Sequence, residues 1–164
     1  MENSIHPKVQ IGHVHLTIAD IDRSLKFYRD LLGFNVTARF GSSAVFLSSG
    51  SYHHHIGLNT WAGNDVTPPP EGHSGLYHFA ILYPDRYELA KAFKTLWENK
   101  YPLEGASDHG VSESIYIKDP DGNGIELYCD RPPDEWPVDE DGNYLLVTKP
   151  LDLPSLLSEL DLQK

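Results

Sequence analysis

Four positions of the chain pair up as candidate metal ligands, because the second half of the sequence repeats the first. His15-Leu16-Thr17-Ile18 aligns with His78-Phe79-Ala80-Ile81 at an offset of 63 positions. Ile56-Gly57-Leu58 aligns with Ile125-Glu126-Leu127 at an offset of 69. The start and end of each copy therefore supply four candidate slots, namely His15, Gly57, His78 and Glu126. Three of them have side chains that bind metals, and glycine has none.

This set of side chains favours a metal centre with open positions. Two histidines and one carboxylate are the ligand set of non-haem iron(II) oxygenases, in which an octahedral ion keeps room for a chelating substrate and for dioxygen. His13 and His15 point to the same side of a strand, because side chains alternate between faces, so either could bind; the repeat selects His15. Glu126 lies in an apolar strand, where a buried carboxylate is costly unless it is paired or bound to a cation.

Three further residues fit chemistry at the same centre. His55 follows His53-His54 and shares a strand face with position 57, so as a neutral histidine it could take a proton from a bound hydroxyl and return it. His54 stays open as the alternative for this role. Tyr116 could donate a hydrogen bond to a substrate oxygen, or simply pack in the core. His109 precedes the Tyr116 strand and could close over the substrate, or lie at the surface.

The elements that must position these residues form one pattern twice. The first repeat, about 9–60, reads as a strand, a helix and three strands, at 9–19, 22–32, 34–40, 44–49 and 54–60. The second, about 76–129, has the same order, with strands at 76–83, 102–105, 112–118 and 124–129 and a helix capped by Asp85. Its helix presents an apolar face of Leu89, Ala92, Phe93, Leu96 and Trp97. We therefore expect an α+β fold in which two tandem βαβββ modules form one curved mixed sheet around a metal-binding cleft.

Length and composition limit the domain organisation and the partners. The chain of 164 residues fits a single domain, predicted over 8–131, followed by an acidic extension over 132–164 with a short leucine-rich helix. A net charge of −11 argues against nucleic acid as a partner. The lack of a long apolar run argues against a membrane span. The single Cys129 cannot form an internal disulfide, so the cytoplasm is the expected compartment.

Three stretches of the sequence resemble the vicinal oxygen chelate superfamily, which includes glyoxalase I, bleomycin-resistance proteins, fosfomycin-resistance enzymes and extradiol dioxygenases. These stretches are His15-Leu16 with Asp20, Ser24 and Phe27-Tyr28, then 75–82, and then 119–126. The resemblance covers about 8–148 and is greatest, over 76–143, to bacterial catechol 2,3-dioxygenases. It implies iron ligation by His15, His78 and Glu126, an acid/base role for His55, substrate contacts for Tyr116 and His109, and a homodimer.

The expected function is therefore an extradiol dioxygenase that uses Fe(II), with Mn(II) as the alternative metal, to cleave a catechol-type ring with O2. A glyoxalase-like isomerase is a second interpretation, but in that family all four ligand slots are filled, and Gly57 leaves one empty. A thiol transferase with another divalent metal needs three ligands, but it gives His55 and Tyr116 no evident task. A metal-free small-molecule binding or resistance protein is disfavoured by three intact ligand-type residues.

Overall fold

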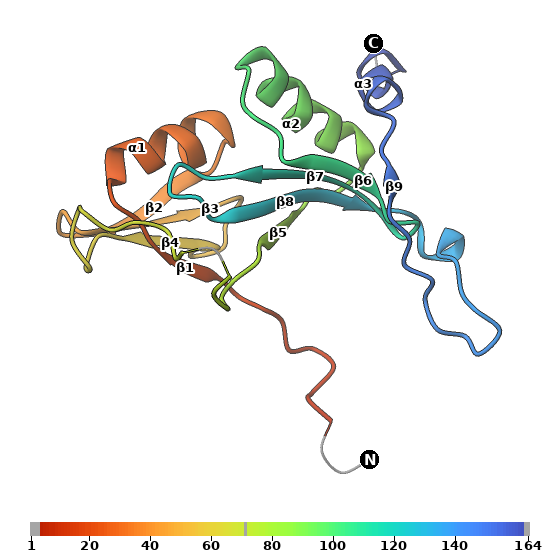
Figure 1. Ribbon diagram of the computed structural model, residues 1–164, viewed down its shortest axis with the longest axis horizontal. Coiled ribbons are helices and arrows are strands. Elements are labelled where there is room, and N and C mark those ends of the chain that lie inside the picture. Colours follow the sequence, from red (N-terminus) through yellow and green to blue (C-terminus); the bar gives the residue numbers. More distant parts are fainter. Residues whose placement is uncertain (1–3, 71, 163–164) are drawn as a thin grey trace. The chain divides into compact units, whose positions relative to one another are not determined.

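The computed structural model describes residues 4–70 and 72–162 and divides into two compact units, Met1–Thr67 and Pro68–Lys164. Each unit contains one repeat and one mixed sheet (Figure 1). The α+β class and the two βαβββ modules are confirmed. The strands form two sheets, one per repeat, where the sequence predicted a single curved sheet. The domain limits 8–131 and 132–164 stay predictions.

The first unit has a four-stranded sheet with a short helical segment between its first two strands. The sheet order is β1-β4-β3-β2, with β1 parallel to β4 and the other pairs antiparallel. The elements are β1 (Val14–Thr17), α1 (Ile21–Leu25), a π-helical segment η1 (Lys26–Leu31), β2 (Asn35–Phe40), β3 (Ala44–Ser48) and β4 (Ile56–Asn59).

Local chemistry explains where this helical segment begins and ends. The Asp20 side chain accepts a hydrogen bond from the Arg23 N–H at 2.7 Å and caps α1. Leu25 and Tyr28 are buried against the sheet. Gly33 has a φ of +84°, a conformation that glycine adopts without strain, and it ends the helix as the sequence predicted. In β1, Leu16 is buried while His15 points to the other face.

The second unit repeats this plan and adds a C-terminal strand and helix. Its sheet order is β5-β8-β7-β6-β9, with β5 parallel to β8. The elements are β5 (Phe79–Leu82), α2 (Arg86–Glu98), β6 (Gly105–Asp108), β7 (Ser112–Lys118), β8 (Gly124–Asp130), a 3-10 turn η2 (Pro133–Glu135), β9 (Lys149–Pro150) and α3 (Leu153–Leu162).

Helix α2 covers one face of this second sheet (Figure 1). Its capping residue is Asp85, as predicted, and the Asp85 side chain accepts from the Glu88 N–H at 2.8 Å. Most of the predicted apolar face is buried, but Trp97 is 66% exposed, and Ala90 is buried instead. The prediction for Trp97 was wrong because this residue stands in the last turn of α2, whereas the buried Ala90 lies seven residues earlier on nearly the same side of the helix.

The predicted tail helix forms, as α3, and it packs on α2 of the same chain. Arg86 connects the two helices to the sheet: its guanidinium donates to Glu113 Oε2 at 2.7 Å, to the Ser155 carbonyl at 3.2 Å and to Glu159 Oε1 at 2.5 Å. Arg131 donates to the other oxygen of Glu113 at 2.8 Å. The Glu113 side chain is 6% exposed, so two arginines neutralise a buried carboxylate.

Among the residues that the structure describes, none of the helices has both the length and the apolar character of a membrane span.

We expect Arg86→Met to lower the free energy of unfolding by about 1.5–3 kcal/mol, because Glu113 loses a charged hydrogen-bond donor and α3 loses its anchor. Urea unfolding followed by circular dichroism measures this. The matched control is Lys91→Met on the same helix, which removes an exposed pair with Glu88 and a contact with the Tyr87 ring and should cost clearly less than Arg86→Met. Equal losses in the two variants would contradict the anchoring role.

Candidate functional site

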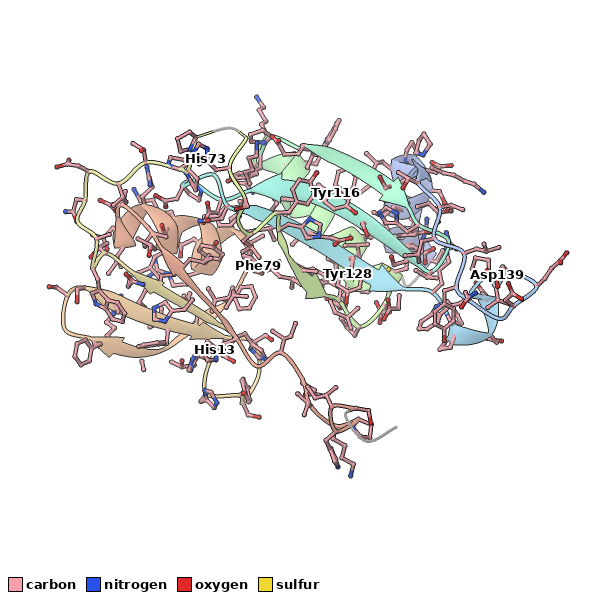
Figure 2. The ribbon with its side chains drawn as sticks, turned by 60° about the horizontal axis from the view of Figure 1, so that its bottom comes forward. His13, His73, Phe79, Tyr116, Tyr128 and Asp139 are labelled. Atoms are coloured by element: carbon pink, nitrogen blue, oxygen red, sulfur yellow. The ribbon has the colours of Figure 1, made fainter. Side chains whose placement is uncertain are left out.

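Four of the predicted site residues come together on one face of the second sheet. Tyr116 on β7 lies opposite Glu126 on β8 in the antiparallel register. His78 immediately precedes β5, which runs parallel to β8, and His109 lies between β6 and β7. The apolar side chains that alternate with these, among them Ile115 and Leu127, are buried. In Figure 2 the bottom of the view in Figure 1 is turned forward, and Tyr116 is seen among the side chains of this sheet.

Hydrogen bonds connect these four side chains into a chain that ends on the backbone. His78 Nε2 lies 3.0 Å from Glu126 Oε2. The Tyr116 hydroxyl donates to Glu126 Oε1 at 3.0 Å. His109 Nε2 lies 2.7 Å from the Tyr116 oxygen, and His109 Nδ1 lies 2.8 Å from the Val147 carbonyl oxygen. Both carboxylate oxygens therefore have partners, although the Glu126 side chain is only 14% exposed.

The partners along this chain limit what each group can do. A carbonyl oxygen only accepts, so His109 Nδ1 carries the hydrogen shared with Val147. The Tyr116 hydroxyl donates to Glu126, and its oxygen also contacts His109 Nε2. The chain thus sets a phenol between a carboxylate and an imidazole.

Tyr116 is held in its protonated form by its surroundings. Burial raises the pKa of Tyr116, and the hydrogen bond to Glu126 and the negative charge of that carboxylate raise it further, to about 12, while Ser114 opposes the rise. The phenol therefore keeps its proton across neutral pH and acts as a donor.

His78 and Glu126 are spaced as two ligands of one ion would be. Atoms bound at about 2.1 Å to one octahedral ion lie about 3 Å apart at right angles, and the observed separation is 3.0 Å. The donor set, an imidazole nitrogen and a carboxylate oxygen, suits a divalent transition metal. Within the described part of the second unit, no third His, Cys, Asp or Glu joins them.

The other two predicted site residues, His15 and His55, lie in the first unit. His15 on β1 lies beside Gly57 on the parallel strand β4, and a Cβ placed on Gly57 would come within 2.9 Å of His15 Cγ. The His15 ring also packs near Phe46 and Trp61, with centroids 5.8 and 5.3 Å away. Glycine at position 57 therefore serves packing, because the His15 ring covers it.

The structure corrects the alignment of the two repeats. The helix caps Asp20 and Asp85 are equivalent and lie 65 positions apart, where the sequence alignment used 63. The strand registers agree: the first residue of β1 pairs with Ile56, and the first residue of β5 pairs with Ile125. The equivalence of Gly57 and Glu126 is thus confirmed.

The corrected alignment changes which histidine matches His78. His13 and His78 each immediately precede the first strand of their repeat, whereas His15 matches Ala80. The repeat therefore favours His13 over His15 as the equivalent of His78. The ligand assignment itself stays a prediction.

His13 belongs to a cluster of histidines. Its ring centroid lies 4.5 Å from that of His54, and His54 Nδ1 lies 2.7 Å from His53 Nδ1. Burial lowers the pKa of His54, and the neighbouring histidines, His13 first, lower it further, so this ring stays neutral at neutral pH.

The His55 ring makes its polar contacts with residues other than those around His54. Its Nδ1 lies 2.9 Å from Ser48 Oγ and 3.4 Å from the Ser49 nitrogen. Ser48 is fully buried on β3 and gives the His55 ring a fixed orientation. A histidine anchored through Nδ1 has Nε2 left for acid/base work.

Sequence reasoning missed three groups at these sites. The choice of His13 could have been found from the caps, because Asp20 and Asp85 stand equally far from His13 and His78. Nothing in the sequence apart from its position in a predicted strand marks Ser48 as a partner of His55. Nothing marks the Val147 carbonyl as a partner of His109, because every residue has the same backbone carbonyl.

Comparisons with known proteins agree with this fold. The family profile described as Glyoxalase/Bleomycin resistance protein/Dioxygenase superfamily matches residues 10–127. The chain belongs to this superfamily. A glyoxalase/dioxygenase structure from Nostoc punctiforme, 19% identical, covers 80% of this chain and 99% of its own, with a TM-score of 0.66, and shows the same fold.

Two curated relatives differ in the activity that their names state. Catechol-2,3-dioxygenase of Bacillus subtilis (strain 168) is 42% identical over 95% of this chain and 54% of its own length. Glutathione transferase FosA of Serratia marcescens is 30% identical over 72% of this chain and 79% of its own length. The chain thus spans about half the length of the dioxygenase that it matches.

We predict that a difference titration between the wild type and Tyr116→Phe, read as tyrosinate absorbance just after a pH jump, shows one phenol ionising near pH 12. In a Glu126→Gln background the same difference should move toward pH 10, because the charge that disfavours the phenolate is gone. A midpoint near 10 in both backgrounds would mean that Tyr116 does not donate to Glu126.

Proposed function

We propose that this protein is a non-haem iron(II)-dependent extradiol dioxygenase that cleaves a catechol-type ring with O2. The observation that carries the proposal is the chain His78–Glu126–Tyr116–His109, which joins a histidine–carboxylate pair to two proton donors. The 42% identity to a catechol-2,3-dioxygenase supports this reaction class.

The residues proposed to hold the metal are His78, Glu126 and one histidine of the first unit. The repeat equivalence favours His13 as this third ligand, and His15 is the alternative. Fe(II) is the proposed ion and Mn(II) the alternative. When bound, such an ion would let electron density pass from the ring to dioxygen, which does not otherwise react readily with a closed-shell catechol.

The overall reaction adds both atoms of O2 to the ring, so that the product, a ring-opened hydroxy-semialdehyde acid, contains every atom of the catechol and of the dioxygen. The carbon–carbon bond that breaks lies beside the diol, and no other reductant is consumed. His55, anchored by Ser48, would accept a catechol proton and later return it. Tyr116 and His109 would donate hydrogen bonds to oxygens that gain negative charge as the ring opens.

A thiol transferase is the second candidate, favoured by the 30% identity to FosA. Such a reaction needs a cation and a leaving-group donor, but it assigns no role to the anchored His55. An isomerase with a fourth protein ligand is disfavoured, because the His15 ring occupies the space that a side chain at position 57 would need. A homodimer and a cytoplasmic location remain part of the proposal, as the sequence predicts.

Iron loading tests the ligand set. After anaerobic addition of Fe(II) and gel filtration, we expect about one iron per wild-type chain and little in His78→Ala, Glu126→Ala and His13→Ala, because each removes a ligand. His15→Ala should retain iron and serves as the matched control on the same strand face. The reverse result for His13 and His15 would return the third ligand to His15.

Ring cleavage tests the reaction. Iron-loaded protein mixed with catechol and then air should form a yellow product, which its absorbance measures. His55→Gln and Tyr116→Phe should keep their iron but lose about 10²–10⁴-fold in kcat, the usual contribution of a general acid or base. If the loaded wild type cleaves no catechol but opens an epoxide with a thiol, the transferase is the correct assignment.

A further inference from the structure

Asp108 is the last residue of β6, next to His109, and its carboxylate is bonded to the turn that carries this histidine. Its Oδ1 accepts a hydrogen bond from the Gly110 N–H at 2.8 Å. Its Oδ2 accepts from Arg131 Nη2 at 2.9 Å. An aspartate that accepts from the backbone two residues ahead closes a tight turn around the residue between them. Here the enclosed residue is His109.

Arg131 holds the same turn at two further points. Its N–H donates to the Val111 carbonyl at 2.8 Å, and its Nη2 also donates to Glu113 Oε1 at 2.8 Å. Glu113 is buried on β7, so the guanidinium that binds it has little freedom to move. The Asp108 carboxylate thus connects the turn to a charged group that is itself fixed in the sheet.

The C-terminal extension packs closely against this turn. Gly110 has a φ of +78°, and a Cβ placed there would come within 3.2 Å of Pro137 Cγ and 3.3 Å of Val147 Cγ2. The Val147 backbone accepts from His109 Nδ1 and donates to the His109 carbonyl. The imidazole is therefore held at Nδ1, which leaves Nε2 to contact Tyr116.

The Asp108 carboxylate is ionised at neutral pH. Burial would raise its pKa, but the Gly110 N–H and the charge of Arg131 lower the pKa below the ordinary value of an aspartate. Lys149, opposite Asp108 in the β6–β9 register, lowers it further. An ionised acceptor makes stronger hydrogen bonds than a neutral one, so the carboxylate is well suited to hold the turn.

Asp108 and Arg131 lie outside the space in which a substrate would bind. A cavity of about 490 Å³ has His78, His109 and Tyr116 in its wall. Asp108 and Arg131 are not among the residues that line it. An effect of Asp108 on the chemistry must therefore act through a residue such as His109.

We propose that Asp108 is a positioning residue for His109: it closes the turn, links it to Arg131 and so fixes the imidazole beside the Tyr116 hydroxyl. The inference rests on the proposed function, in which His109 donates a hydrogen bond to an oxygen of the substrate. A displaced donor stabilises the developing charge less well, and a displacement of about 1 Å can cost about 10²-fold in rate.

A double-mutant cycle on the iron-loaded full chain tests this role. Asp108→Ala should lower kcat/KM for catechol by about tenfold or more, and Asp108→Asn should restore most of it, because an amide oxygen still accepts from the Gly110 N–H. In a His109→Gln background, Asp108→Ala should cause no further loss, because the residue that it positions is already absent. Losses that multiply in the double variant would overturn the proposal.

Asp20→Ala is the matched control, because Asp20 also accepts a backbone N–H, from Arg23 at 2.7 Å, but caps α1 in the first unit. Both alanine variants should unfold at a lower urea concentration than the wild type, since each loses a side-chain bond to the backbone. Activity should fall in Asp108→Ala alone. If the two variants lose equal activity, the effect is one of stability and the positioning role is wrong.

A measurement without metal separates this inference from the proposed function. In carbon–proton correlation NMR of the metal-free chain, the ring signals of His109 are identified by their absence in His109→Gln. They should move toward the values of a freely rotating histidine in Asp108→Ala and stay in place in Asp20→Ala. If they stay in place in Asp108→Ala, the positioning role is excluded. If they move but the wild type cleaves no catechol, the proposed function fails and the positioning of His109 stands.

Discussion

The candidate site depends on keeping one carboxylate, Glu126, ionised within a sheet that is mostly apolar. A partly buried carboxylate needs partners for both of its oxygens, and here His78 serves one and Tyr116 the other. The same pairing raises the pKa of Tyr116 to about 12, after burial itself, and keeps the phenol a donor. The position of His109 follows in turn, because its Nε2 lies 2.7 Å from the Tyr116 oxygen. One partly buried charge thus orders three other side chains of the unit.

The C-terminal extension contributes to this order in two separate ways. The Val147 carbonyl accepts from His109 Nδ1, and the Val147 N–H donates to the His109 carbonyl at 3.2 Å, so the backbone holds this residue from both sides. Further along, Glu159 on α3 binds Arg86, whose other partner is the buried Glu113 on β7. Because β7 also carries Tyr116, the tail supports the strand on which the proton donors are mounted.

Most of the fold could be predicted from periodic and capping patterns. The alternation of apolar residues and the caps at Asp85 and Gly33 located the strands and helices closely, because burial and backbone geometry are encoded residue by residue. The exception was Trp97, an exposed apolar residue of α2. Ala90, on nearly the same side of the helix, is buried, so the place of Trp97 in the last turn decided the outcome and not its apolar character.

The candidate site was harder to predict than the fold. The convergence of His78, Tyr116, His109 and Glu126 was expected, because strand pairing brings residues of the β7–β8 hairpin opposite one another. The preference for His13 over His15 was missed, because the alignment followed the shared strand residues and not the equal spacing of His13 and His78 from the caps; the strand register makes the difference plain. The Val147 carbonyl is a property of the backbone path, which side-chain types do not reveal.

The packing of His15 on Gly57 has a counterpart in the second unit, where Ala80 lies beside Glu126. In each parallel pair, a large side chain on one strand lies beside a small one on the other. The large residue is on β1, the first strand of its repeat, in the first unit, and on β8, the last strand of its repeat, in the second. A lineage that acquired a carboxylate at position 57 would first have to shrink residue 15. A change in the number of protein ligands would then require coupled substitutions at positions 15 and 57. A larger residue at position 57 alone would collide with His15, and a smaller residue at position 15 alone would leave a void.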